Sequence, residues 1–525
     1  MIMRSHHRGR RAVVPSLLAA LTLLVAGCTS GGGSDEEAAP TTSSAPAEPT
    51  AEPVEWTPSN DLIQPLVAGR PGSERGLSFD RAQVEVPITY DEPEGERLPM
   101  TVVRAVFPGQ TDKIGSLVVN PGGPGASGVD AAIGLALTLP EDVLRRFDIV
   151  GFDPRGVSLS SPVECIPDET KDRLVASEPQ PTSAEQLDEV FALADEVAQD
   201  CADRYESPEA LGAFNTVDTA RDMDLLREAL GEEQLTYLGY SYGTTLGSTY
   251  AELFPDRVRA FVLDAAVDPD ADAQADAEAQ AAGLEASFDA FAQNCLALIA
   301  GCPVGPDPRR FTDELMLQAA LGPIPSSAEG ETRQATPGVV LTAITAALYD
   351  TDTWPQLSQA LAAARNGDSA GLFSLADSYV GRLEDGTYSN QLDANVAINC
   401  ADTDQEIDTD EVRRLAAEWD ARYPLFGAGT AASLYTCTPW EAERTPLPER
   451  DAEGSAPILV VGNSGDPVTP LPGAVDMAEQ LTSGVLLTWQ GQGHTAYPKN
   501  QCINDAVNRY LIDLVVPLDG LTCPA

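Results

Sequence analysis

Short apolar runs alternate with segments of helical pattern along much of this chain, and no other feature limits its possible folds as strongly. Between residues 216 and 230, for example, Val217, Ala220 and Leu226 recur at helical spacing. Buried strands that are connected by helices predict an α/β architecture, with a mainly parallel sheet and helices on both of its faces. The apolar runs that we interpret as strands are 117–119, 147–150, 235–238, 258–263, 458–461 and 485–487.

Two regions depart from this alternation. Residues 84–88 and 101–106 alternate apolar and polar side chains and predict an antiparallel hairpin that opens the sheet. Residues 269–447 carry alanine-rich helical patterns and no convincing strand, so we expect an inserted, mostly helical cap above the carboxyl ends of the strands. The core of the fold would then consist of a first segment at 59–268 and a second at 448–525.

The amino terminus has the pattern of an export signal. Arginines precede an uncharged apolar stretch at residues 12–26, and residues 25–28 match a lipobox that ends in Cys28. A stretch of this length is too short to span a bilayer. We therefore predict a lipoprotein signal peptide at 1–27 and a lipid on Cys28 that anchors the protein to the outer face of the cell membrane, with simple secretion as the alternative. The composition of residues 28–58 predicts a flexible linker.

The cysteines predict disulfide bonds. Of the nine cysteines, eight lie beyond the export segment, and an even number in an exported protein favours disulfides. A zinc site is a weaker interpretation, because no CxxC pair exists and only one histidine remains beyond the export segment. Sequence alone does not determine the pairing, but the positions fall into four local couples. The predicted pairs are Cys165–Cys201, Cys295–Cys302, Cys400–Cys437 and Cys502–Cys523.

A serine motif points to nucleophilic chemistry. Residues 239–243 read Gly-Tyr-Ser-Tyr-Gly and lie between a predicted strand and a helical stretch. This context is typical of a nucleophile at a sharp strand-to-helix turn, and an ordinary glycine-bearing turn is the alternative. Serine needs a neighbouring base. His494 is the one imidazole beyond the export segment and follows the last predicted core strand. We predict Ser241 as the nucleophile and His494 as its base.

The imidazole in turn needs a carboxylate that orients it and stabilises its charged form. Asp466 follows the strand at 458–461 and lies between the serine and the histidine in chain order. Asp264, at the end of the preceding strand, is the rival acid. We predict Asp466 as the acid and Asp264 as a structural carboxylate near the start of the cap.

Acyl transfer also needs N–H donors for the developing oxyanion. The residue after the nucleophile, Tyr242, is predicted to supply one of them. The second should come from the loop at 120–125, Asn-Pro-Gly-Gly-Pro-Gly, in which the prolines cannot donate. Among its glycines we choose Gly123. The competing interpretation, a phosphate-binding loop, lacks the required glycine spacing.

The charge balance excludes one class of partner. With 32 basic and 81 acidic residues, the chain has a formal net charge of −49. Such a surface repels phosphate backbones, so we expect no nucleic-acid partner. Contact with a membrane is expected only through the lipid on Cys28.

Taken in order, five motifs resemble the secreted tripeptidyl aminopeptidases, which are α/β-hydrolases related to the prolyl aminopeptidases. The resemblance covers nearly all of the chain after the linker. It implies an α/β-hydrolase fold with a helical cap, no metal or organic cofactor, and removal of short peptides from substrates with free amino termini. The motifs are the loop 120–125, Phe-Asp-Pro-Arg-Gly at 152–156, the serine motif 239–243, Asp-Pro-Val-Thr-Pro at 466–470 and Gly-His at 493–494.

The resemblance also implies roles for individual residues. Ser241, Asp466 and His494 would form the triad, and Gly123 with Tyr242 the oxyanion hole. An exopeptidase should also bind the ammonium group of its substrate with a carboxylate, because a buried cation needs a paired charge. Asp402, Asp404 and the acidic residues near Asp268 are candidates. Arg155 is interpreted as structural, with substrate binding as the alternative.

Two other functions stay open at this point. An esterase or lipase would use the same triad and oxyanion hole on acyl esters. A surface lipoprotein could instead bind peptides without turnover, although the intact serine, histidine and aspartate argue against this.

Overall fold

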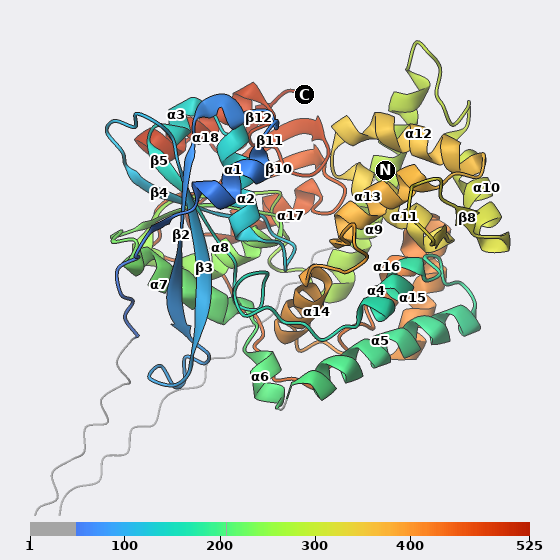
Figure 1. Cartoon of the computed structure of the whole chain (residues 1–525), viewed down its shortest axis with the longest axis horizontal. Helices are drawn as coiled ribbons and strands as arrows, with labels where there is room; N and C mark the ends of the chain where they lie inside the picture. Colours follow the sequence, from blue (N-terminus) through green and yellow to red (C-terminus); the bar gives the residue numbers. More distant parts are fainter. Residues whose placement is uncertain (1–48, 206) are drawn as a thin grey trace, which may run out of the picture. The chain divides into compact units, whose positions relative to one another are not determined.

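The computed structural model describes residues 49–205 and 207–525 and contains a ten-stranded sheet (Figure 1). The strand order is β1-β2-β3-β5-β4-β6-β7-β10-β11-β12. The pairs from β1 to β3 and the pair β3–β5 are antiparallel, and the others are parallel. This confirms the predicted mainly parallel sheet with an opening hairpin. The strands are β1 (Thr57–Pro58), β2 (Ser78–Pro87), β3 (Arg97–Val106), β4 (Gly115–Asn120), β5 (Phe147–Phe152), β6 (Leu235–Tyr240), β7 (Val258–Asp264), β10 (Ile458–Gly465), β11 (Gly484–Gln492) and β12 (Leu521–Cys523).

Helices cover both faces of the sheet, which explains why its central strands β4, β5 and β6 are buried along their whole length. On β4, Leu117 and Val119 belong to one hydrophobic core and Val118 to the other, because successive side chains of a strand point to opposite faces. The first core is closed by α2 (Gly128–Thr138) and α18 (Gln501–Asp513). The second is closed by α7 (Thr216–Ala229), α8 (Tyr242–Leu253) and α17 (Leu471–Gln480).

The predicted linker ends earlier than residue 58. The N–H of Val54 donates to the carbonyl of Ala229 at 3.0 Å. The guanidinium of Arg104 stacks on the ring of Trp56, 4.4 Å from its centroid. Strand β1 then pairs with β2. The composition of this segment hid these contacts, because a single tryptophan and a two-residue strand are enough to attach it to the sheet.

The inserted segment after β7 is mostly helical, as expected. It contains one short antiparallel pair, β8 (Ile324–Pro325) with β9 (Gln334–Ala335), where the sequence showed no convincing strand. Two residues are too few for a recognisable strand pattern. The helices of this segment are α9 (Ala273–Leu296), α10 (Pro308–Leu321), α11 (Pro337–Leu348), α12 (Trp354–Arg365), α13 (Ala370–Val380), α14 (Gln391–Ala401), α15 (Thr409–Arg422) and α16 (Gly427–Ser433).

The cap also includes residues that precede the nucleophile, which the prediction of a single inserted segment missed. Helices α4 (Asp168–Ala176), α5 (Ala184–Arg204) and α6 (Pro208–Gly212) lie between β5 and α7. Phe191 of α5 packs in one core with Trp419 of α15, and Figure 1 shows α5 running beside α15 and α16. The cap is therefore assembled from two separate stretches of the chain.

The structure contains all four predicted disulfides. Two of them, Cys165–Cys201 and Cys400–Cys437, join the same hydrophobic core within the cap, and the other two are Cys295–Cys302 and Cys502–Cys523. None of the helices in the described ranges is both long enough and apolar enough to cross a bilayer. Cys28 and the predicted signal peptide lie outside the described residues.

Candidate active site

Ser241 occupies a strained turn between β6 and α8. Its φ of 54° and ψ of −126° are sparsely populated for a residue with a side chain. The turn is held by the Ser241 N–H, which donates to the carbonyl of Asp264 on β7 at 2.9 Å. Gly239 permits it, because a methyl group there would lie 2.3 Å from the Gly243 carbonyl oxygen. This is the strand-turn-helix geometry that the serine motif predicted.

Asp466 and His494 form a hydrogen-bonded pair at the ends of the neighbouring strands β10 and β11. The imidazole Nδ1 lies 2.9 Å from each carboxylate oxygen, and the side chains are almost fully buried. A carboxylate at Nδ1 places the proton on that nitrogen and leaves Nε2 free to accept one. In the described part of the chain no hydrogen bond joins Ser241 to His494, a contact that often tightens only when substrate binds. The catalytic roles stay predictions, but the structure brings the predicted acid and base together.

The rival acid, Asp264, is a fully buried carboxylate with a different task. It accepts hydrogen bonds from the N–H groups of Ala496, at 3.1 Å, and Tyr497, at 2.7 Å. Burial raises the pKa of Asp264 to about 6, against the opposing effect of these two N–H donors. Since its carbonyl also holds Ser241, Asp264 connects the nucleophile's turn to the loop after His494. This placement fits the predicted structural role.

The glycine loop after β4 lies against the nucleophile. A methyl group on Gly122 would come within 2.5 Å of the Tyr240 carbonyl oxygen and 3.0 Å of Ser241 Cβ. The N–H of Gly122 donates to Asn120 Oδ1 at 2.9 Å. No hydrogen bond within the described ranges uses the N–H of Gly123. The N–H of Tyr242 is the first of α8 and has no intrahelical acceptor. Within the described residues, both predicted oxyanion donors are thus without a hydrogen-bond acceptor.

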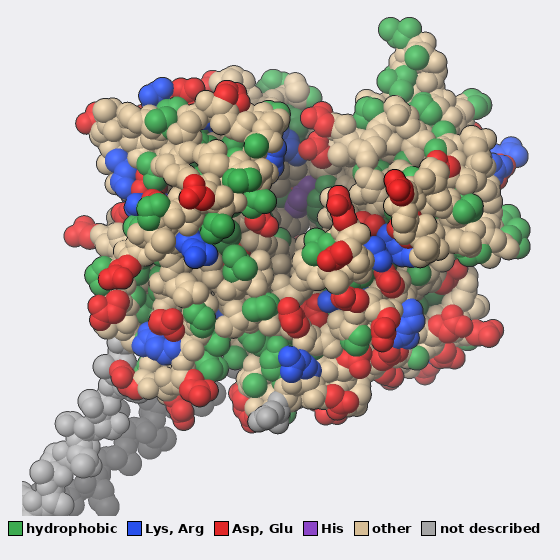
Figure 2. Space-filling model, viewed as in Figure 1, with side chains coloured by type: hydrophobic (Ala, Val, Ile, Leu, Met, Phe, Trp, Pro, Cys, Tyr) green, Lys and Arg blue, Asp and Glu red, His purple; other side chains and the backbone are tan. Residues whose placement is uncertain are grey.

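The cap reaches the active site through Tyr349, which follows α11. The carbonyl of Tyr349 accepts the backbone N–H of His494 at 2.8 Å. Its ring meets the imidazole edge to face, with 5.1 Å between the ring centroids. Figure 2 shows a histidine at the bottom of a hollow on the molecular surface, and His494 is the one histidine of the described ranges. The imidazole therefore lies between the sheet and a cap residue.

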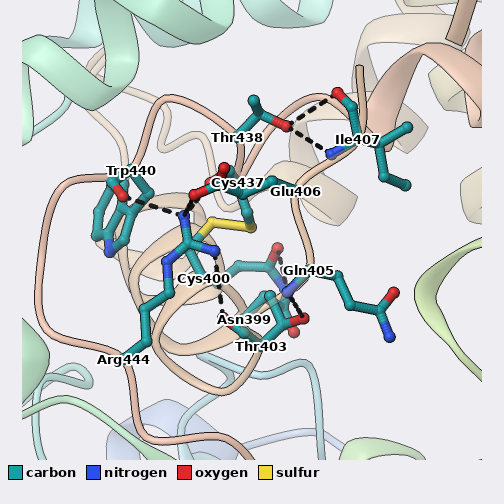
Figure 3. The surroundings of a disulfide bond; sticks show 11 residues. Asn399, Cys400, Thr403, Gln405, Glu406, Ile407, Cys437, Thr438, Trp440 and Arg444 are labelled. Atoms are coloured by element: carbon teal, nitrogen blue, oxygen red, sulfur yellow. Dashed lines mark hydrogen bonds and ion pairs between the residues drawn. A yellow bond between two sulfur atoms is a disulfide. The ribbon is translucent and has the colours of Figure 1, made fainter. Parts of the chain in front are cut away.

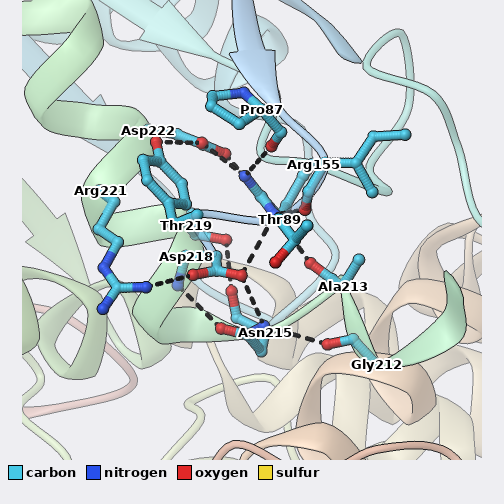
Figure 4. A network of polar contacts seen from close by, with 12 residues as sticks. Pro87, Thr89, Arg155, Gly212, Ala213, Asn215, Asp218, Thr219, Arg221 and Asp222 are labelled. Atoms are coloured by element: carbon cyan, nitrogen blue, oxygen red, sulfur yellow. Dashed lines mark hydrogen bonds and ion pairs between the residues drawn. The ribbon is translucent and has the colours of Figure 1, made fainter. Parts of the chain in front are cut away.

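Arg155, in the Asp-Pro-Arg-Gly motif, is a structural residue (Figure 4). It is about 1% exposed, and its guanidinium donates to both carboxylate oxygens of Asp222 at 2.8 and 2.7 Å. The remaining donors go to carbonyl oxygens, so all five N–H groups are used. These acceptors are Pro87, Ile88 and Ala213. The network ties the β2–β3 hairpin to α7, and no guanidinium donor is left for a substrate.

The three predicted amine-binding regions lie in different surroundings. Asp402 caps the end of α14, and both of its carboxylate oxygens accept hydrogen bonds from Thr216 at the start of α7. Burial raises the pKa of Asp402 to about 7, while the Thr216 hydrogen bonds and the charge of Arg450 lower it. Asp404 is exposed on the following loop. Asp268 accepts local backbone hydrogen bonds between β7 and α9.

Sequence reasoning missed three residues that touch this machinery. Thr469 Oγ1 lies 3.4 Å from His494 Nδ1, and its place in the Asp-Pro-Val-Thr-Pro motif was a usable signal. Thr216 contacts both Asp402 and the side chain of Tyr242, and Tyr349 contacts the imidazole. Neither Thr216 nor Tyr349 stands in a motif, so only packing reveals them.

The comparisons with known proteins agree with this geometry. A family model described as alpha/beta hydrolase fold matches residues 115–301, and one described as TAP-like protein matches residues 423–523. The tripeptidyl aminopeptidase of Streptomyces coelicolor is 30% identical over 454 residues, which are 84% of this chain and 82% of that protein. This chain belongs to the tripeptidyl aminopeptidase family of α/β-hydrolases.

Two mycobacterial relatives extend the comparison. Serine protease Hip1 of Mycobacterium tuberculosis is 38% identical over 493 residues, or 91% of this chain and 92% of that protein. Carboxylesterase B of the same species is 35% identical over 458 residues, or 84% of this chain and 86% of that protein. With this fold and family, the protein is a serine hydrolase of the peptidase type.

Proposed function

We propose that this protein is an exported aminopeptidase that releases tripeptides or other short peptides from free amino termini. The observation that carries the proposal is the hydrogen-bonded pair of Asp466 and His494 at strand ends beside Ser241, which has the backbone conformation of a nucleophile at a sharp turn. A relative named tripeptidyl aminopeptidase supports the substrate class.

In the mechanism, Ser241 Oγ attacks the carbonyl carbon of the scissile peptide bond while His494 Nε2 takes its proton. The carboxylate of Asp466 stabilises the imidazolium that results. The N–H groups of Tyr242 and Gly123 hold the oxyanion of the tetrahedral intermediate. His494 then passes the proton to the leaving amine and an acyl-enzyme remains. Water attacks the ester with His494 again as base, which frees the short peptide as an acid and restores the serine.

In our proposal the cap restricts the enzyme to the ends of peptide chains. Because Tyr349 contacts the imidazole, cap residues bound the space directly beside His494. A cleft bounded in this way can admit the end of a chain and exclude its middle. The net charge of −49 gives the surface a potential that attracts the ammonium group of such a substrate.

The test is a pair of matched substrates, a tripeptidyl anilide with a free amino terminus and its N-acetylated twin. We expect strong preference for the free amine and no activity in Ser241→Ala. Equal rates on the two anilides, or no hydrolysis of either, would refute the aminopeptidase proposal. Labelling of Ser241 by a fluorophosphonate probe shows independently whether the serine is activated.

A carboxylesterase is the second candidate, because relatives named Carboxylesterase B are 35% identical to the chain. Its triad and oxyanion hole would be the same. Hydrolysis of p-nitrophenyl butyrate without hydrolysis of the free-amine anilide would favour it. Failure of a fluorophosphonate to label Ser241, together with no turnover of either substrate, would instead favour a peptide-binding lipoprotein.

We further propose that a lipid on Cys28 anchors the protein at the outer face of the cell membrane. The support is the lipobox at residues 25–28 after an apolar stretch. Metabolic labelling with a radioactive fatty acid should mark the wild-type protein and leave Cys28→Ala unlabelled. Labelling of the variant, or release of the wild type into the medium without label, would contradict the anchor.

A further inference from the structure

The residue after the nucleophile is held by its side chain as well as by its backbone. The Tyr242 hydroxyl lies 2.5 Å from Thr216 Oγ1, at the start of α7. Burial raises the pKa of the Tyr242 phenol, and the charge of Asp402 adds to this effect, so the phenol keeps its proton and can donate. Tyr242 is thus fixed at two points, its place in the nucleophile's turn and its hydroxyl.

The chain of hydrogen bonds continues into the cap. Thr216 Oγ1 donates to Asp402 Oδ2 at 2.6 Å, and the Thr216 N–H donates to Asp402 Oδ1 at 2.8 Å. Burial raises the pKa of Asp402 to about 7, so above this pH the carboxylate is ionised and only accepts. Because the threonine hydroxyl has a single proton, the hydrogen bonds then run from Tyr242 through Thr216 to Asp402. A negative group at the first N–H of α7 also interacts favourably with the helix dipole.

Asp402 is itself fixed in place. It follows α14, where the Cys400–Cys437 disulfide joins the end of the helix to a later loop (Figure 3). Arg444 reinforces that loop by donating to the carbonyls of Cys437, Trp440 and Thr403. The backbone of Asp402 also accepts from the N–H of Leu447 at 3.3 Å. The carboxylate is therefore presented from a rigid part of the cap.

Thr216, the middle member of this series of hydrogen bonds, is also held in place. Thr216 is fully buried, and the helix it begins is capped by Asn215, whose side chain accepts the N–H of Asp218 at 2.8 Å. Arg155 forms an ion pair with Asp218 in the same turn of α7, 3.5 Å apart, and donates to the carbonyl of Pro87 in the β2–β3 hairpin (Figure 4). Thr216 and Asp402 therefore cannot shift without disturbing the sheet or the cap.

We propose that Asp402 and Thr216 are positioning residues that hold Tyr242, and through it the oxyanion N–H beside Ser241, so that the cap contributes to the chemical step. The proposal rests on the oxyanion role of Tyr242 in the proposed function. It differs from the sequence-based hypothesis that Asp402 binds the substrate amine, because the two carboxylate oxygens bind Thr216 of the core. A strained turn needs such external support, since its backbone conformation is unfavourable by itself.

The experiment separates these two roles with a substrate that has no amine. We compare kcat and KM on p-nitrophenyl acetate and on the free-amine tripeptidyl anilide for Thr216→Val, Thr216→Ser, Tyr242→Phe and Asp402→Asn. Thr216→Val and Tyr242→Phe should each lower kcat about tenfold on both substrates, the size expected for one hydrogen bond in a charged network, with KM changed less than about twofold. Thr216→Ser keeps the hydroxyl, so its kcat should stay near that of the wild type.

Two comparisons guard against a general loss of structure. Thr219→Val removes a hydroxyl from the same helix, one that donates to the Asn215 carbonyl at 2.8 Å, and should leave ester hydrolysis within about twofold of the wild type. The double variant Thr216→Val/Tyr242→Phe should be no slower than either single variant, because both remove one shared interaction.

Three results would overturn the proposal. Unchanged ester kcat in Thr216→Val and Tyr242→Phe would show that the hydrogen bonds do not act on the oxyanion donor. A loss in Asp402→Asn confined to the free-amine anilide would assign Asp402 to the substrate amine. A loss in Thr219→Val equal to that in Thr216→Val would show a purely structural effect. If the protein has no preference for free amines, the aminopeptidase proposal fails. The ester measurements still test the positioning role of Thr216 and Asp402 in that case.

Discussion

The sheet and the cap both reach the catalytic residues, but they do so in different ways. On the sheet side, Ser241, Asp466 and His494 follow the parallel strands β6, β10 and β11, whose carboxyl ends meet at one edge. On the cap side, Tyr349 and Asp402 come from the ends of α11 and α14 and reach the site through hydrogen bonds and a ring contact with residues far away in the sequence. Parallel strands position chemical groups through chain geometry, whereas the cap acts through contacts between distant segments.

Asp264 shows how closely the sheet side is tied together. Its backbone holds the nucleophile's turn, and its side chain holds the loop after the histidine. Asp402 does something similar from the cap side, with a longer connection through Thr216. We expect changes at the strand ends to act on the chemistry directly and changes in the cap to act more weakly through a neighbour.

The largest expected effect comes from Asp466→Asn. Without the carboxylate the imidazole adopts the wrong tautomer, so kcat on the tripeptidyl anilide should fall about 10⁴-fold. Asp264→Asn is the matched control, because it neutralises the neighbouring buried carboxylate but keeps an acceptor for Ala496 and Tyr497. It should lower kcat by no more than about tenfold, the equivalent of roughly one hydrogen bond. Equal losses would mean that both carboxylates act on the imidazole.

The comparison can be extended to stability at the hairpin that faces α7. Arg155→Met leaves Asp222 as an unpaired buried carboxylate, so the free energy of unfolding in urea should drop by about 3–5 kcal/mol. Arg221→Met removes a partly exposed arginine that pairs with Asp218 on the same helix, and about 1 kcal/mol or less is expected there. If the free energy of unfolding fell by the same amount in both variants, burial of the Arg155 ion pair would not make it more important for stability than the partly exposed pair.

The buried carboxylate of Asp264 should give the folding of the sheet a pH dependence. Its pKa is raised to about 6 by burial, near the charges of His494 and Asp466, from about 3.9 in the unfolded chain. A raised pKa in the folded state means that its contribution is complete below about pH 4 and is lost as the pH rises through 6. Relative to Asp264→Asn, the unfolding free energy of the wild type should fall by on the order of 3 kcal/mol between pH 4 and pH 7. Parallel pH profiles would contradict the raised pKa.

The smallest effect is expected at the cap contact with the imidazole. Tyr349→Ala removes the ring that meets His494 edge to face but keeps the backbone carbonyl that accepts its N–H. An aromatic pair contributes about 1 kcal/mol, so kcat should fall roughly fivefold. Tyr349→Phe keeps the ring and should stay within about twofold of the wild type. A loss in Tyr349→Ala as large as that in Asp466→Asn would remove the distinction between sheet and cap.

Much of the fold could be predicted because its signals are local. The parallel sheet follows from apolar runs separated by helical patterns, and the predicted opening hairpin is present as β2 and β3. Each of the four disulfides joins a cysteine to the next cysteine along the chain, which is why their pairing could be predicted. Where signals were short or distant, prediction failed. The two-residue strands β1, β8 and β9 and the contribution of α5 to the cap had no pattern to reveal them.

The sequence by itself determined the order of the strands along the chain and the serine turn. It also indicated that Asp264, Asp466 and His494 lie at one edge of the sheet, because the carboxyl ends of parallel strands meet there. Only the tertiary structure decided which carboxylate holds the imidazole and which supports the turn, since Asp264 and Asp466 follow adjacent strands. It also decided that the cap contacts Tyr242 and His494. Those contacts join residues far apart in the chain, and they exist only because the helices between them pack in one particular way.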